Sequence, residues 1–89
     1  MNADVSGIGN FESKIDVRGY IPEDAMSMLQ DFLDKAIINN AYELQIIHGV
    51  GNGTMRRRVH QKLKEYKDIK EYFHPEENLG GEGITYVKM

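Results

Sequence analysis

The sequence contains no cysteine, so a disulfide framework, a thiol nucleophile and cysteine-based zinc or iron–sulfur sites are all excluded. It also lacks any apolar run near the roughly 20 residues that a membrane-spanning helix needs. The first residues show no basic and apolar pattern typical of a secretion signal. With 89 residues there is room for one domain. We therefore expect a soluble, cytoplasmic domain with no membrane partner.

Positive charge is scarce overall but concentrated in one segment. The formal net charge is −3, yet residues 1–49 carry a net charge of −5 and residues 54–70 a net charge of +5. A basic patch on an acidic protein can attract a polyanion locally, even where the total charge would repel it. A solvated helix face is the alternative explanation of the same pattern.

The spacing of apolar residues predicts the secondary structure. In chain order the expected elements are a strand at 14–19, a helix at 20–41, a strand at 43–49, a helix at 55–66, and strands at 69–74 and 84–89. A glycine-rich loop at 75–83 joins the last two strands. Residues 1–13 show no sustained period, so we expect a flexible linker there and a folded domain over 14–89.

This order, β-α-β-α-β-β, predicts an α/β two-layer sandwich. Two strand–helix–strand units imply parallel pairing by right-handed crossovers, and the closing hairpin adds one antiparallel strand. We expect a four-stranded mixed sheet with both helices on one face. On the second helix, Met55 and Val59 belong to the core stripe, whereas Arg57, His60 and Lys64 are expected to point into solvent.

The ends of the first two strands carry the residues most capable of chemistry. Ligands of such sheets bind beyond the carboxyl ends of parallel strands, so Arg18-Gly19 and His48-Gly49 should meet at one rim. His48 can act as a general acid or base, although a structural histidine is the commoner case. Asp16 can orient His48, hold a divalent ion or pair with Arg18. Arg18 can clamp a phosphate oxygen and stabilise charge developing on phosphorus.

A glycine-rich turn leads from this rim into the second helix. Gly49, Gly51 and Gly53 permit positive φ angles and close backbone approach, and Thr54 is the expected helix cap. A helix N-terminus favours a phosphate, and Arg56 lies one turn further on. The pattern is neither GxGxxG nor a P-loop, so a simple connecting turn is the alternative.

The sequence predicts no metal cluster. It has neither an HxxEH motif nor paired carboxylates at a ligating spacing, and we expect His60 and His74 to be surface histidines. A hydrated Mg²⁺ needs only one or two carboxylates, so Mg²⁺ or Mn²⁺ stays open as a cofactor, with no ligand residue assigned.

Three separated motifs resemble those of the Smr (small MutS-related) domain family, in the same order. They are the IDVRG segment at 15–19, the HGVGNG segment at 48–53, and the closing Gly80, Gly81, Gly83 and Thr85. The resemblance covers residues 14–89 and is strongest to the version at the C-terminus of the second bacterial MutS family. Position 18 carries the arginine variant of the first motif.

The resemblance implies a fold similar to the C-terminal domain of bacterial translation initiation factor three, and nicking endonuclease activity on DNA or RNA. It also implies a parent MutS-like ATPase, dimeric through its other domains, that suppresses recombination at branched DNA or acts on stalled ribosomes. Carried over by position, the candidate catalytic residues are Asp16, Arg18 and His48, and the candidate backbone contacts are Gly49, Gly51, Gly53 and Arg56. The glycine loop and the basic helix themselves add Thr54, Arg57 and Lys64 as candidate nucleic-acid contacts.

Three functions therefore compete. The first is a nicking endonuclease in which His48 activates water or the leaving oxygen. The second is a non-catalytic module that binds DNA, RNA or a ribosome through the basic helix, with binding that weakens steeply as salt rises. The third is a small domain that binds a phosphorylated metabolite, independently of the basic helix.

Overall fold

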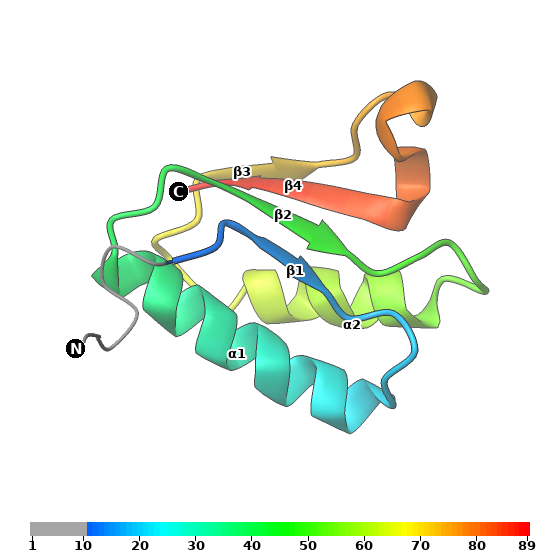
Figure 1. Ribbon diagram of the computed structural model, residues 1–89, viewed down its shortest axis with the longest axis horizontal. Helices are drawn as coiled ribbons and strands as arrows, with labels where there is room; N and C mark the ends of the chain where they lie inside the picture. The colour runs from blue at the N-terminus through cyan, green and yellow to red at the C-terminus, as the bar shows by residue number, and fades with distance from the viewer. Residues whose placement is uncertain (1–10) are drawn as a thin grey trace.

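The structure, a computed structural model, describes residues 11–89 and consists of a sheet layer and a helix layer (Figure 1). In chain order its strands and helices are β1 (Lys14–Asp16), α1 (Pro22–Ile38), β2 (Glu43–Ile47), α2 (Thr54–Leu63), β3 (Glu71–Phe73) and β4 (Ile84–Lys88). Two short 3-10 helices, η1 (Glu77–Leu79) and η2 (Gly81–Gly83), occupy the segment between β3 and β4. The expected element order and the two-layer α/β fold are confirmed.

The sheet has the strand order β1-β2-β4-β3. β1 and β2 are parallel, with Ile15 beside Ile46, and β4 is antiparallel to both of its neighbours. The expected direct pairing of the third strand with the second is wrong, because β4 lies between them. β3 still runs in the same direction as β2. The central position lets β4 form ladders on both of its edges, and Thr85 and Val87 are fully buried there.

Both helices lie against the same face of the sheet, as expected (Figure 1). α1 begins with Pro22 and has two acidic residues in its first turn, which suits the positive end of the helix dipole. It lies within the expected segment 20–41 and ends at Ile38, because Asn39 caps it and Asn40 adopts a left-handed conformation with φ of 53°. The buried helical residues are Ala25, Leu29, Phe32, Leu33 and Ala36 of α1, and Val59 and Leu63 of α2.

The hydrophobic core lies between the helix layer and the sheet. Leu44, Ile46 and Val87 of the two central strands contribute to it, together with the buried helix residues. Neither α1 nor α2 covers the opposite face of the sheet (Figure 1). This arrangement leaves two places for a site: the open face, and the edge where β1 and β2 end and β4 begins.

The segment before β1 contacts both α1 and β2. Phe11 stacks on Phe32 of α1 with ring centroids 5.5 Å apart, and the Gln45 amide donates to the Ser13 carbonyl. Of the expected linker at 1–13, residues 1–10 lie outside the described residues. Across residues 11–89, neither helix offers an apolar stretch long enough to span a bilayer.

Candidate functional site

The ends of β1 and β2 meet at one edge of the sheet, which we call the rim: Asp16, Arg18 and the glycine turn 49–53 (Figure 1, right). Gly49 follows β2 with φ of 81°, and a Cβ placed on it would lie 3.4 Å from Cγ of Arg18. The Arg18 side chain therefore passes directly over the Gly49 backbone. Segments some 30 residues apart are brought together here by the parallel pairing of β1 with β2.

Arg18 and Asp16 form a two-pronged ion pair at the rim. Nε of Arg18 donates to Oδ1 of Asp16 at 2.9 Å, and Nη2 donates to Oδ2 at 2.6 Å. The backbone amide of Arg18 donates to Oδ1 as well. These hydrogen bonds lower the pKa of Asp16 and raise that of Arg18, so both stay charged at neutral pH. Of the three roles considered for Asp16, pairing with Arg18 is the one present in the structure.

His48 does not join this ion pair. Asp16 and Arg18 are exposed, whereas Val17 and His48 are buried, at 0% and 5% exposure. Because neighbouring side chains of a strand alternate between its faces, the His48 imidazole lies on the helix side and the Arg18 guanidinium on the open side. A pocket shared by these two groups, as expected from the motif order, is therefore not formed.

Instead, His48 belongs to a cluster of three histidines on the helix side of the sheet. Its Nδ1 lies 2.9 Å from the Gly49 carbonyl oxygen, and its Nε2 lies 2.8 Å from Oγ1 of Thr85. Nε2 of His60 lies 3.1 Å from the same hydroxyl, and Nδ1 of His74 lies 2.8 Å from the carbonyl oxygen of Ile84. Both ring nitrogens of His48 thus have partners.

The expectation that His60 and His74 are isolated surface residues is wrong. Both are half-buried, and their ring centroids lie 5.2 Å apart. Burial lowers the pKa of His60 to about 4 and also lowers that of His48, and both shifts are reinforced by nearby positive groups. The sequence signal for a buried His74 was its spacing of two residues from Tyr72, which places both side chains on one face of the strand. Tyr72 packs on the core and contacts His60, so this is the helix-side face.

The glycine turn positions the start of α2. Gly53 is the N-cap residue in a left-handed conformation, with φ of 87°, and it makes no side-chain cap. The expected cap by Thr54 is wrong, because Thr54 is the first helical residue. The Thr54 backbone amide instead donates a hydrogen bond to Oδ1 of Asn52 at 3.0 Å. The Asn52 side chain therefore satisfies a free amide at the start of α2.

Two further arginines reach the turn from the first turn of α2. A Cβ placed on Gly53 would lie 3.0 Å from Nη2 of Arg56 and 3.4 Å from Nη1 of Arg57. Arg56 also donates to Glu82 of η2 at 2.8 Å, whereas within residues 11–89 Arg57 takes part in no ion pair. The glycine turn is thus contacted at Gly49 by the aliphatic part of Arg18 and at Gly53 by the guanidinium groups of Arg56 and Arg57.

The rest of the basic segment is divided between two surfaces. Arg58 approaches Glu23 at 3.8 Å and Lys62 donates to Gln30 at 2.9 Å, so both of them bridge α2 to α1. Lys64, the residue that follows α2, is exposed. Exposed Lys67 and Lys70 also follow α2, so these lysines lie at the end of the helix opposite the rim.

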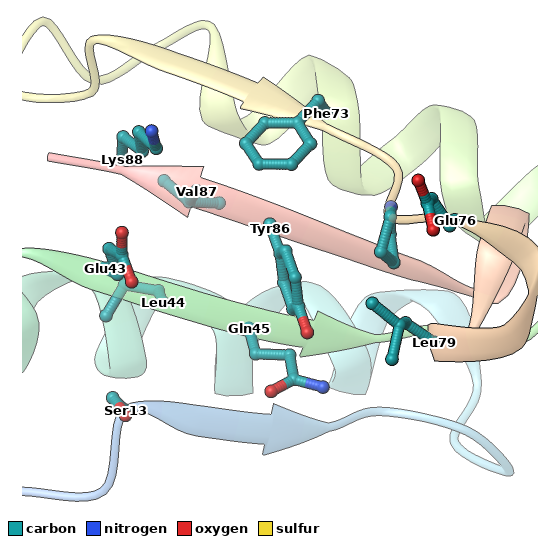
Figure 2. A pocket seen from close by; sticks show the side chains of 11 residues that line it. Ser13, Glu43, Leu44, Gln45, Phe73, Glu76, Leu79, Tyr86, Val87 and Lys88 are labelled. Carbon is teal, nitrogen blue, oxygen red and sulfur yellow. The ribbon is translucent and has the colours of Figure 1, made fainter.

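A pocket of about 520 Å³ lies on the open face of the sheet. Figure 2 shows Tyr86 and Gln45 standing on the central strands beside Phe73, with Leu79 of η1 facing them. Glu43 and Glu76 also line it, against Lys88 as its basic residue. This pocket is aromatic and rich in carboxylates, so it is a poor place for a phosphate.

Comparison with known protein families gives a match over almost the whole described chain. A family model described as the Smr domain matches residues 15–89. The chain is 40% identical over 76 residues to a protein of Streptococcus suis named Endonuclease MutS2, and 40% identical over 75 residues to the protein of the same name from Streptococcus mutans. These matches cover 85% and 84% of this chain but 10% of each relative, so the chain spans about a tenth of their length.

Solved structures show the same fold. The crystal structure of the Smr domain of Thermus thermophilus MutS2 matches with a TM-score of 0.80 at 25% identity, covering 86% of this chain and 96% of that one. YdaL, a stand-alone small MutS-related protein from Escherichia coli, matches with a TM-score of 0.81 at 24% identity, covering 86% of this chain and 63% of that one.

Proposed function

The chain belongs to the Smr domain family, and from that premise we propose that it binds the sugar–phosphate backbone of DNA or RNA at the rim. The observation that carries this proposal is that Arg56 and Arg57 lie against Gly53 at one end of the glycine turn and Arg18 lies against Gly49 at the other. Arginine recognises phosphate oxygens with two parallel hydrogen bonds, and bare backbone lets a phosphate approach closely.

The arginines retain donors for such a ligand. Asp16 occupies Nε and Nη2 of Arg18, which leaves the end of the guanidinium at Nη1 for a phosphate. Glu82 accepts from Nη1 of Arg56 and is itself exposed, so a phosphate can compete for that arginine. Arg57 is exposed on the same turn of α2.

The test is a set of salt titrations of binding to a short duplex and to a short RNA hairpin. Arg57→Ala should weaken binding and reduce the slope of log affinity against log salt by about 1. The matched control is Arg58→Ala, on the same helix but directed at Glu23 of α1, and it should change the slope less. Affinity that does not depend on salt, or equal effects of the two variants, would refute binding at the rim.

A second candidate function is nicking of a phosphodiester bond, favoured by the name Endonuclease MutS2 that the relatives carry. In this proposal Arg18 holds the phosphate and stabilises the developing charge, and Asp16 keeps Arg18 in position. Neutral His48 is the candidate proton acceptor. Because His48 is 5% exposed, bonded at both nitrogens and on the opposite side of the sheet from the Arg18 guanidinium, it reaches a phosphate held by Arg18 only if the end of β2 opens locally.

Nicking of supercoiled plasmid, with Mg²⁺, with Mn²⁺ and with EDTA, tests this candidate and its metal requirement. His48→Gln preserves a polar group beside Thr85, and circular dichroism shows whether the variant is folded. If His48 is the base, the folded variant loses nicking but still binds DNA. Nicking at the wild-type rate by His48→Gln would remove this assignment, whereas loss of nicking in Arg18→Ala alone would place the chemistry at the rim.

Phosphorylated metabolites fit the structure less well. The pocket of the open face presents Glu43 and Glu76, which repel a phosphate. Saturable binding of a mononucleotide that is unaffected by Arg57→Ala would support this alternative.

For the larger context, we propose that the domain contacts nucleic acid or the ribosome on behalf of an ATPase, as in a MutS-like protein that dimerises through other domains. The support is the match to one tenth of MutS2 relatives. Linking this chain to such ATPase domains should raise affinity for branched DNA or ribosomes above that of the isolated domain.

A further inference from the structure

We propose that His48, His60 and His74 form a zinc-binding site on the helix side of the sheet. The proposal does not depend on phosphate binding at the rim, because it concerns side chains on the opposite face from Asp16 and Arg18; it shares His48 with the nicking candidate. These are the three histidines of the chain, and each comes from a different part of the fold: the end of β2, the middle of α2 and the residue after β3.

The first support is distance. One ring nitrogen from each histidine lies within 4.8 Å of the others. Three imidazole nitrogens at Zn–N distances of 2.0–2.1 Å in a tetrahedron are about 3.3 Å apart. Closing the cluster therefore requires shifts of about 1.5 Å at most, and half-buried His60 and His74 can make these by side-chain rotation.

The second support is the tautomer that the backbone imposes. Nδ1 of His48 faces the Gly49 carbonyl and Nδ1 of His74 faces the Ile84 carbonyl, and a carbonyl only accepts hydrogen bonds. Both rings therefore carry the proton on Nδ1 and an unshared pair on Nε2. A zinc-bound histidine usually has this arrangement, with a carbonyl or carboxylate holding the second nitrogen.

The third support is the hydroxyl of Thr85. Its Oγ1 lies 2.8 Å from Nε2 of His48 and 3.1 Å from Nε2 of His60. One hydroxyl oxygen thus lies within hydrogen-bond distance of two of the three imidazoles. With zinc bound, three imidazoles leave a fourth position for water, and Thr85 is placed to accept or donate a hydrogen bond beside it.

The ligand chemistry suits a transition-metal ion, with one opposing influence. Arg56 and Lys64 lie near enough to His60 to repel a cation, but Arg56 is paired with Glu82 at 2.8 Å. A set of imidazoles without carboxylates selects zinc, copper or nickel over magnesium or calcium.

Titration of the untagged chain with ZnCl₂, followed by calorimetry and thermal unfolding, tests the site. We expect one equivalent to bind and the unfolding temperature to rise with zinc concentration, since the ion links three elements of the folded state. MgCl₂ should do neither. Long-range ¹H–¹⁵N spectra of the wild-type chain should show all three imidazoles shifting together at one equivalent.

The variant for this test is His74→Gln, whose side-chain amide can still donate to the Ile84 carbonyl. It should bind zinc at least about 10-fold more weakly, the smallest loss expected even for an outer-shell partner. Tyr72→Phe is the matched control, because it keeps the ring that packs near His60 and removes no imidazole; zinc affinity should be unchanged. Zinc binding that shifts one imidazole only, that is equally strong in His74→Gln, or that does not saturate at one equivalent would overturn the proposal.

Discussion

At the residue scale, the alternation of side chains along a strand decides which parts of a motif meet. Asp16 and Arg18 face the open side, while Val17 and His48 face the helices. Residues that a sequence motif groups as one site are thereby divided between two surfaces. The rim presents arginine side chains, and the histidine cluster presents three imidazole nitrogens within 4.8 Å of one another.

Asp16→Asn should strengthen nucleic-acid binding a few-fold at low salt, because it removes a carboxylate from the rim and frees the Arg18 fork. Asp31→Asn on exposed α1 makes the same change of charge away from the rim, and it should have a smaller effect. Because the Asp16 pKa is lowered, its pairing contributes to stability above the ordinary carboxyl value of 3.8 and is lost as pH falls below it. Weaker binding by Asp16→Asn would contradict this account.

Gly80→Ala should destabilise the domain by about 1–3 kcal/mol, the usual cost of a strained backbone position. Gly80 has φ of 119°, and a Cβ there would overlap the Ile84 side chain. The comparison is Gly51→Ala, at φ of 45° with open space around it, which should cost less than Gly80→Ala, about 1–2 kcal/mol from the left-handed backbone alone. Urea unfolding measures both, and equal effects would show that the turn relaxes.

At the element scale, polar contacts join α2 and the residues just after it to α1 and to η2. The contacts with α1 come from Arg58, Lys62 and Tyr66, and the contact with η2 comes from Arg56. These links fix the direction of the helix and hence the positions of Arg57 and His60. The basic side chains of this helix thus serve its placement as well as any ligand.

Tyr66→Phe should lower the free energy of unfolding by about 0.5–1.5 kcal/mol, because the Tyr66 hydroxyl donates to Asp34 at 3.1 Å. Burial and this carboxylate raise the pKa of Tyr66 to about 12. The protonated phenol is favoured by folding, so this stabilisation is complete below pH 10 and is lost as pH rises toward 12.

Urea unfolding at neutral and alkaline pH checks this prediction. Tyr42→Phe, at a ring that is 74% exposed, is the control and should change stability little. A loss for Tyr66→Phe that is unchanged between pH 8 and pH 12 would contradict the assigned hydrogen bond.

At the scale of the whole molecule, the sequence predicted the layers better than the contacts. Helix spacing in α1 and α2 and the two strand–helix–strand units were enough to predict a two-layer fold with both helices on one face. The central position of β4 was not predictable, because a hairpin can join the sheet through either of its two strands. The meeting of His60 and His74 with His48 depends on that position, because Thr85 of β4 contacts both His48 and His60.

Phe11→Ala should destabilise the domain by about 1–3 kcal/mol, through loss of the half-buried ring stacked on Phe32. Thermal or urea unfolding measures the loss. The result also tests the expected boundary at residue 14, which predicts no effect from a change at residue 11. No effect would place Phe11 in the linker.

The central place of β4 also has a kinetic meaning. It is the last element in chain order, yet β2 and β3 reach each other only through it. We therefore expect the four-stranded sheet to form only after β4 has been synthesised. A chain interrupted before Ile84 should expose unpaired backbone edges of β2 and β3, which favours association with other chains.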